Sequence, residues 1–228
     1  MYNIHMNKLN IEKQKQIVSA LVEGNSMRST ARMSGVSINT VVKLLIDLGT
    51  VCAEYQDKVF RDLQCKRIQC DEIWSFCYAK EKNLPKELKK RKGYGSVWTW
   101  TAICADTKLV PSWAVGDRDA RTAKMFMDDL AKRLGNRVQL TTDGHKPYLE
   151  AVEGAFGCDI DYGMLIKLYG TPQEKDSRYS PVECIGTLEK TVSGNPDPNH
   201  LSTSFVERQN LTMRMGMRRG KSLLPKSV

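Results

Sequence analysis

The spacing of apolar residues changes after residue 64 of the 228-residue chain, from a helical period to the alternation typical of β-strands. Strand-like segments rich in β-branched and aromatic residues follow at 67–76, 94–106 and 109–117. A short link joins the last two, so we expect the three segments to form an antiparallel meander. This part of the chain is therefore predicted to fold around a β-sheet.

After the meander, helices and strands alternate. An amphipathic helix is predicted over 119–135, and the strand "RVQLTTDG" (137–144) follows it. A second helix over 145–156 and a fifth strand over 158–170 continue the pattern. Strands that first meander and then alternate with helices imply an α/β fold with a mixed five-stranded sheet flanked by helices.

A long stretch without a regular pattern precedes the last predicted helix. Residues 171–199 are rich in Pro, Gly, Asn and charge, so we expect an irregular segment there. Loops of this length in compact domains are usually functional or disordered. The last helix is predicted to begin near Ser202, in "STSFVERQNLTMRMGMRR".

The N-terminal part predicts helices only. A short helix is expected over 11–23, followed within 26–49 by four residues whose steps of four, six and three suit a helix-turn-helix: Ala31, Gly35, Val41 and Leu44. Ser37 is the predicted N-cap of the second helix. Four polar residues are then free to face a major groove of DNA: Ser37, Asn39, Thr40 and Lys43. The spacing leaves an ordinary helical hairpin open as the alternative.

The charge balance favours a polyanionic partner, with nucleic acid ahead of an anionic membrane. The chain has 35 Lys and Arg against 26 Asp and Glu, a formal net charge of +9. Within 80–92, seven Lys and Arg stand against two Glu, and we expect this loop to track phosphates rather than to be only a solvated surface. Its candidate DNA contacts are Lys89, Lys90, Arg91 and Lys92. The tryptophans are expected in the core of the sheet face rather than as stacking platforms for bases: Trp74, Trp98, Trp100 and Trp113.

Cysteine usage and hydropathy predict the compartment. The seven cysteines form no CxxC pair, which is typical of reduced thiols in the cytosol. No apolar segment approaches the ~18 residues of a membrane span, and the first residues lack the apolar core of a signal peptide. We expect a cytoplasmic protein, associated with the nucleoid and without a membrane partner.

Two neighbouring acids lie in the middle of the first predicted strand. Asp71 has apolar residues on both sides, and an ionised carboxylate there costs several kcal/mol unless a cation or strong hydrogen bonds compensate it. Glu72 is expected on the opposite face of the strand. Only one of the two acids is therefore predicted to reach a common site.

Two further acids have both a local and a functional interpretation. Asp143 closes the fourth strand and precedes Gly144, so it either forms an Asp-Gly turn or presents a carboxylate at a strand end, where ligands collect. Glu207 has the capping-box spacing from Ser204, or else faces a site from a helix. Asp71, Asp143 and Glu207 are 72 and 64 residues apart and can meet only through the fold.

Four segments carry a resemblance to a known family: "CDEIWSF", "TTDGHKPY", "STSFVERQNLTMRM" and the intervening loop "YGTPQEKDSRYSPVECIG". Together they resemble the bacterial insertion-sequence transposases of the insertion-sequence-one family, which are DDE transposases with a ribonuclease H-like catalytic domain. The resemblance extends from about residue 26 to 218. It implies that Asp71, Asp143 and Glu207 are the catalytic acids and metal ligands.

The implied chemistry is phosphoryl transfer on DNA. Carboxylates suit Mg²⁺ or Mn²⁺, and two such ions can assist both the attacking and the leaving oxygen. A DDE transposase binds transposon ends, cuts a strand with water and then joins the new 3′-hydroxyl to target DNA. His145 could contact DNA or orient Asp143, or it could be structural. Further candidate DNA contacts lie on the last helix: Arg208, Asn210 and Arg214. We expect a homodimer or a higher assembly on DNA.

The resemblance also divides the chain and shows two departures from the family. The predicted divisions are a helix-turn-helix domain (1–49), a helical connector (50–64), a ribonuclease H-like domain (65–219) and a divergent tail (220–228). The cysteine zinc-binding module common in the family is missing, and the resemblance ends near residue 219 as if the chain were truncated. The alternatives are a catalytically inactive DNA-binding repressor or inhibitor of transposition, and the inert product of a decayed element.

Overall fold

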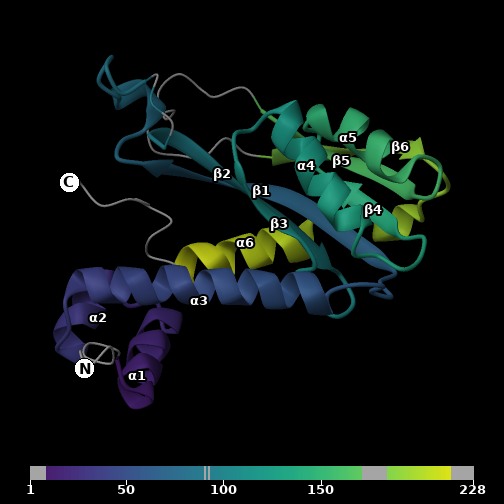
Figure 1. Cartoon of the computed structure of the whole chain (residues 1–228). Coiled ribbons are helices and arrows are strands. Elements are labelled where there is room, and N and C mark those ends of the chain that lie inside the picture. Colours follow the sequence, from purple (N-terminus) through teal and green to yellow (C-terminus); the bar gives the residue numbers. More distant parts are fainter. Residues whose placement is uncertain (1–8, 90, 92, 171–183, 217–228) are drawn as a thin grey trace. The chain divides into compact units, whose positions relative to one another are not determined.

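The computed structural model describes residues 9–89, 91, 93–170 and 184–216 (Figure 1). These residues divide into two compact units, one formed by 9–59 with 212–216 and the other by 60–211. The first unit is helical, and the second contains a β-sheet. The predicted positions Lys90 and Lys92, the tail from 220 and residues 171–183 of the predicted irregular stretch lie outside the described residues.

The N-terminal segment of this unit forms three helices: α1 (Ile11–Val22), α2 (Met27–Ser34) and α3 (Ile38–Val59). Asn10 caps α1 by accepting a hydrogen bond from the Lys13 N–H, and Ser26 caps α2 in the same way. A small core joins the helices through Ile17, Ala31 and Val41. The helix expected at 11–23 is therefore present, as are helices on both sides of Gly35.

The turn between α2 and α3 depends on a glycine. Gly35 adopts a left-handed conformation with φ 65°, which glycine reaches without the penalty of a Cβ atom. Ser37 Oγ accepts the Asn39 N–H at 3.2 Å, as expected of an N-cap. Helix α3 continues through residue 49, so the predicted connector begins as its last turns. No single helix in the described part of the chain is long and apolar enough to cross a membrane; only α2 and α3 taken together would be, and they are bent by 112°.

The second unit contains a mixed sheet of six strands in the order β3-β2-β1-β4-β5-β6. Its strands are β1 (Arg67–Cys77), β2 (Gly95–Cys104), β3 (Trp113–Gly116), β4 (Gln139–Thr142), β5 (Asp161–Tyr169) and β6 (Cys184–Ser193). β1, β2 and β3 form the predicted antiparallel meander, β4 lies parallel to both β1 and β5, and β6 is antiparallel to β5. The α/β class and the mixed sheet are confirmed, but the predicted number of five strands was wrong.

The missed strand, β6, lies inside the stretch that was predicted to be irregular. It occupies the edge of the sheet, and most of its residues are exposed on both faces. Such a strand needs no apolar alternation, because its stability comes from backbone pairing with β5. A pattern of buried residues could not reveal it.

Helices α4 (Ala120–Ala131) and α5 (Pro147–Phe156) pack together on one face of the sheet (Figure 1). The core between them and the sheet includes Phe126 and Met127 of α4, Tyr148 and Val152 of α5, and Ile68, Cys70, Trp100 and Leu140 of the strands. Two short 3₁₀ helices, η1 (Glu81–Asn83) and η2 (Pro198–His200), lie in loops. Cys70 thus marks the face of β1 that α4 and α5 cover.

Helix α6 (Ser204–Gly216) begins against the other face of β1. Gln69 Oε1 accepts the N–H groups of Phe205 and Val206 at 2.9 and 3.1 Å, which satisfies two donors that the first turn of a helix leaves unpaired. The predicted capping box does not form, because the Ser204 N–H donates to Ser202 Oγ and Ser204 is already helical. Gln69 and Cys70, neighbours in β1, therefore face opposite sides of the sheet, Gln69 toward α6 and Cys70 toward α4 and α5.

Candidate functional site

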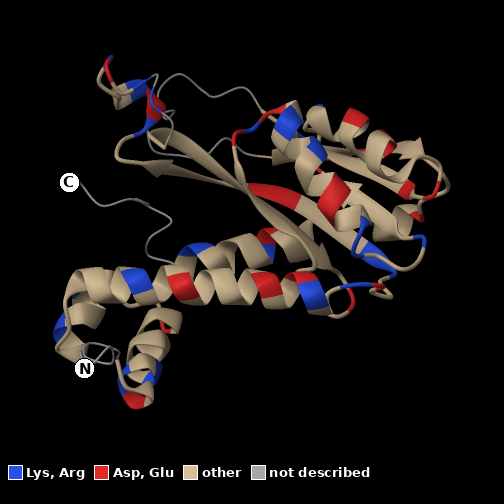
Figure 2. Cartoon of the chain, in the orientation of Figure 1, with Lys and Arg blue, Asp and Glu red and all other residues tan. Residues whose placement is uncertain are grey.

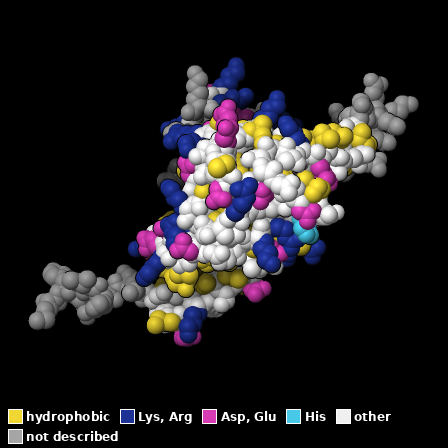
Figure 3. All heavy atoms as spheres, turned by 90° about the vertical axis from the view of Figure 1, so that its right-hand side faces the viewer, with side chains coloured by type: hydrophobic (Ala, Val, Ile, Leu, Met, Phe, Trp, Pro, Cys, Tyr) yellow, Lys and Arg dark blue, Asp and Glu magenta, His cyan; other side chains and the backbone are white. Residues whose placement is uncertain are grey.

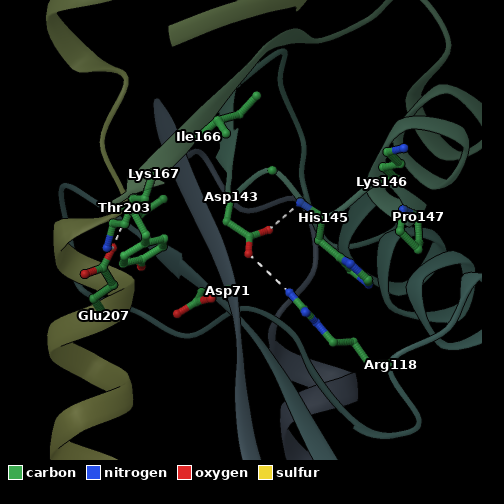
Figure 4. Close-up of a pocket in the computed structure, with 12 residues that line it drawn as sticks. Asp71, Arg118, Asp143, His145, Lys146, Pro147, Ile166, Lys167, Thr203 and Glu207 are labelled. Carbon is green, nitrogen blue, oxygen red and sulfur yellow. Dashed lines mark hydrogen bonds and ion pairs between the residues drawn. The ribbon is translucent and has the colours of Figure 1, made fainter. Parts of the chain in front are cut away.

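The three acids expected to meet line one open pocket of about 710 Å³. Asp71 comes from β1, Asp143 follows β4, and Glu207 lies in the first turns of α6. Figure 4 shows Asp71 between the other two acids, with the Asp143 carboxylate turned toward Arg118 and His145 and the Glu207 carboxylate beside Lys167 and Thr203. The fold therefore brings together residues that are far apart in the sequence.

Strand register explains why Asp71 and Asp143 converge. The last paired residues of parallel strands β1 and β4 are Cys70 and Thr142. An aspartate follows each of these residues: Asp71 within β1 and Asp143 just after the end of β4. The two acids therefore stand side by side at the point where β4 ends and β1 continues. Figure 2 shows the acidic segment in the middle of β1.

Asp71 is half-buried and fixed by the helix that also carries Glu207. Its Oδ2 accepts a hydrogen bond from Asn210 Nδ2 at 2.8 Å. Burial raises the pKa of Asp71, and the nearby charges of Asp143 and Glu207 raise it further, while the Asn210 hydrogen bond opposes the shift. A bound cation would relieve this crowding of negative charge.

Asp143 forms a local turn and also faces the pocket. Its Oδ1 accepts the His145 N–H at 2.9 Å, and its Oδ2 accepts from Arg118 Nη2 at 3.3 Å. A Cβ atom on Gly144 would lie only 3.2 Å from the Ile166 side chain, so glycine permits this close approach. The two interpretations of the Asp-Gly pair are therefore compatible.

Glu207 lines the same pocket but is held by other partners. Its Oε1 accepts hydrogen bonds from Lys167 Nζ at 2.6 Å and from the Thr203 hydroxyl. The side chains of Lys167 and Glu207 are 34% and 41% exposed, so this ion pair is open to solvent. In the structure, Lys167 is thus the counter-ion of the third predicted acid.

Glu72 belongs to the acidic cluster, although the sequence predicted otherwise. Carboxylate oxygens of Asp71, Glu72 and Asp143 lie within 4.8 Å of one another. Of the two neighbouring acids only Asp71 lines the open pocket, as expected, but the buried Glu72 carboxylate lies unexpectedly close to the other two. Strand alternation fixes the direction in which a side chain leaves the backbone, but the longer Glu72 side chain is held beside Asp143 by a shared arginine.

The environment of Glu72 is unusual for an acid. Its side chain is 1% exposed, and its buried Oε1 has no hydrogen-bond partner among the described residues. Burial raises the pKa of Glu72 to about 7, and the charge of Asp143 adds to the shift, while Tyr148 and Arg118 oppose it. The cost that singled out Asp71 as a buried strand acid applies equally to Glu72, and this signal was present in the sequence.

Arg118, which follows β3, is the cation of the cluster. Its Nε donates to Glu72 Oε2 at 3.0 Å, its Nη2 donates to Asp143, and its Cζ lies 4.9 Å from the centroid of the Trp98 ring. The guanidinium therefore bridges two acids and stacks on an aromatic ring. No sequence pattern singles out this loop residue.

His145 supports the site through its backbone N–H, while its ring packs on aromatic residues. The ring centroid lies 5.7 Å from that of Trp100 and 6.0 Å from that of Tyr148, and Nε2 is buried without a partner among the described residues. Burial lowers the pKa of His145, with a further contribution from the charge of Arg118. The imidazole is therefore neutral near pH 7.

The other predicted DNA contacts occupy different surroundings. Asn210 is buried and bonded to Asp71, so the structure places it behind the site. The exposed candidates are Ser37, Asn39, Lys43, Lys89, Arg91, Arg208 and Arg214, and Thr40 is partly exposed. On the face shown in Figure 3, Lys and Arg side chains are interspersed with Asp and Glu rather than gathered in one patch.

Comparisons of the sequence with known proteins identify no family. No protein-family model matches the chain, and no curated protein matches it. Its function is therefore inferred from the chemistry and geometry of the pocket.

Proposed function

We propose that the chain is a DDE transposase, similar to those of the insertion-sequence-one family, that cuts DNA at transposon ends and joins the 3′-hydroxyl to target DNA. The observation that carries this proposal is the placement of Asp71 on β1 and of Asp143 directly after the parallel neighbour β4, with Glu207 from α6 lining the same pocket. A meander followed by parallel strands is also what we expect of a ribonuclease H-like domain.

The donor set fits divalent ions. Carboxylate oxygens are hard ligands that Mg²⁺ and Mn²⁺ prefer, and those of Asp71, Glu72 and Asp143 lie within 4.8 Å of one another. Asp71, Asp143 and Glu207, which line the pocket, would hold two ions. When bound, such ions activate the attacking oxygen and stabilise the leaving oxygen of an in-line displacement.

The remaining residues of the pocket orient the acids and bind phosphate. Asn210 holds Asp71, and the His145 N–H holds Asp143. Arg118 and Lys167 neutralise the acids, and both side chains also line the pocket, where they can donate to phosphate oxygens of DNA. The same two cations can therefore serve the acids and the substrate in turn.

The N-terminal unit supports binding to DNA. Helices α2 and α3 meet at 112° across a turn that contains Gly35, within the range of 90–120° that is usual for a helix-turn-helix. Ser37, Asn39 and Lys43 are exposed at the start of α3, where a recognition helix contacts base edges. We propose that this unit binds the transposon ends and that the active form on DNA is a dimer or larger.

A second candidate function is a DNA-binding repressor or inhibitor of transposition without catalysis. The observation that favours it is the position of Glu207, which is bound to Lys167 and Thr203 and is not among the acids that lie within 4.8 Å of one another. If the third acid cannot join the other two, the chain binds DNA but does not cut it.

Strand cleavage separates the two functions. The purified chain is incubated with DNA carrying the terminal repeats of its element and Mg²⁺ or Mn²⁺, beside Asp143→Asn and the matched control Asp159→Asn, whose side chain is 77% exposed. Nicking at the repeat boundary that Asp143→Asn loses and Asp159→Asn keeps supports the transposase. Specific binding without nicking by any of the three proteins refutes it in favour of the repressor.

A further inference from the structure

A second groove of about 640 Å³ adjoins the acidic pocket within the same unit. Lys89 and Arg91 line it from the loop between β1 and β2, Tyr94 and Trp98 line it from around β2, and Arg118 lines both this groove and the acidic pocket. Figure 1 shows β1 and β2 continuing past α4 and α5, so this part of the sheet is not covered by those helices. The groove therefore extends from the candidate catalytic pocket along the hairpin.

Two aromatic side chains face this groove. Tyr94 is 37% exposed and lies edge-on to Tyr78, with ring centroids 5.8 Å apart. Trp98 packs on the core with one part and lines the groove with another, whereas Trp100 is fully buried. The prediction that the tryptophans lie in the core of the sheet face holds for Trp100, is incomplete for the partly buried Trp74 and Trp98, and is wrong for Trp113, which is 46% exposed.

The charges of the groove favour an anion. Three cations line it, Lys89, Arg91 and Arg118, against the acids Glu81 and Asp117. The Glu81 carboxylate already accepts the Ser96 N–H at 3.2 Å. Lys89 and Arg91 are exposed, so both can reach phosphates of a bound strand.

We propose that this groove binds unpaired DNA next to the bond that is cut, with phosphates on Lys89 and Arg91 and a base against Tyr94. Basic side chains alternating with aromatic rings are what single-stranded nucleic acid requires, because only an unpaired base presents its face for stacking. A paired duplex offers this groove its backbone alone. Because Arg118 lines both cavities, the same strand can pass from the groove to the acids. This inference rests on the proposed function.

Binding to two DNA ends of the same sequence tests the proposal. One DNA end is fully paired, and in the other the strand beside the cleavage position is unpaired. Both are titrated with the full chain by fluorescence anisotropy. The titrations contain EDTA, so that cleavage does not interfere. We expect the wild type to bind the unpaired end more tightly. Tyr94→Leu should lose roughly tenfold in affinity for the unpaired end only, while Tyr94→Phe, which keeps the ring, should retain it. The matched control is Tyr55→Leu, at a tyrosine of α3 that is 65% exposed.

The salt dependence tests the phosphate contacts. The double variant Lys89→Gln/Arg91→Gln should make the slope of log affinity against log salt shallower by roughly 1.4, as expected for two lost contacts with a single strand. Arg121→Gln/Lys132→Gln, at two exposed cations on α4 and at its C-cap, outside the groove, should leave the slope unchanged. Equal wild-type affinity for both ends, or an unchanged preference in Tyr94→Leu, overturns the proposal.

Cleavage, measured separately with Mg²⁺, distinguishes this inference from the proposed function. Cleavage that depends on Asp143 without a Tyr94-dependent preference refutes the groove and leaves the transposase. A Tyr94-dependent preference without cleavage keeps the groove in a DNA-binding repressor. Absence of any DNA binding by the wild type refutes both.

Discussion

Replacing Arg118 with glutamine should destabilise the metal-free protein and strengthen its binding of divalent ions. The guanidinium lies between Glu72 and Asp143, and glutamine removes its charge but keeps a shorter, polar side chain. Both effects have one cause, because the arginine neutralises the carboxylates that would otherwise bind a cation.

The magnitude follows from the two contacts of Arg118. The hydrogen bond to Glu72 is 3.0 Å long, and the Glu72 side chain is 1% exposed. A charge-assisted bond to such a buried acceptor contributes about 2 kcal/mol to the free energy of unfolding. The contact with Asp143 is 3.3 Å long between side chains that are 36% and 34% exposed, so it contributes less than about 0.5 kcal/mol. We therefore expect a loss of about 2 kcal/mol.

Urea unfolding followed by circular dichroism at pH 8 in EDTA measures the loss in the free energy of unfolding. The same urea titration with Mn²⁺ in place of EDTA measures the stabilisation that the metal adds. Because Arg118→Gln removes a positive charge from the acids, it should tighten Mn²⁺ binding by roughly tenfold. At saturating Mn²⁺ this adds about 1.4 kcal/mol to the stabilisation by the metal. Arg121→Gln, an exposed arginine of α4, is the control. An Arg118→Gln protein that is as stable as the wild type in EDTA and gains equally from Mn²⁺ would show that the guanidinium is not the counter-ion of these acids.

Three further predictions concern other contacts. Lys167→Met should change the free energy of unfolding by less than about 0.5 kcal/mol, because its pair with Glu207 is solvent-exposed, yet it should tighten Mn²⁺ binding in isothermal titration calorimetry. Gln69→Leu should cost about 2 kcal/mol by leaving two N–H groups of α6 unpaired, and hydrogen exchange at the start of α6 should accelerate. Burial alone would raise the pKa of Asp129, but hydrogen bonds from Arg133 and Ser112 outweigh it and lower the pKa below 3.8. Asp129→Asn should thus cost about 1 kcal/mol of stability at pH 7. This loss fades as the pH falls through the folded-state pKa of Asp129, and urea unfolding midpoints at pH 7 and pH 3 will show it.

Sequence patterns singled out Asp71 and Asp143 as candidates, and their convergence was implied by the resemblance to DDE transposases. Both acids interrupt or end apolar strand segments, and such positions are recognisable because an unpaired carboxylate beside a core is costly. The sequence predicted a mixed sheet but not which strands pair; the parallel pairing of β1 with β4, which places the two acids side by side, is known from the structure. The helix that carries Glu207 was likewise visible from its sequence.

The partners of the acids could not be predicted in the same way. Arg118 lies in a loop after a four-residue strand, and Lys167 lies on β5 within an apolar segment. Which acid each cation meets depends on strand order and side-chain direction, and neither leaves a periodic signal. Glu72 was excluded for a related reason, because alternation describes the backbone and not the reach of a long side chain.

The connection between β1 and α6 limits how Glu207 can join the other acids. Gln69 of β1 fixes the start of α6, and Asn210 of α6 in turn holds Asp71 of β1, so the strand and the helix orient each other's functional residues. Moving α6 toward the cluster would break both sets of hydrogen bonds. Exchanging the Lys167 contact for a metal ion would break only a solvent-exposed pair. We therefore expect metal loading to proceed by exchange of side-chain partners at Lys167 and Arg118, with the backbone of β1 and α6 unchanged.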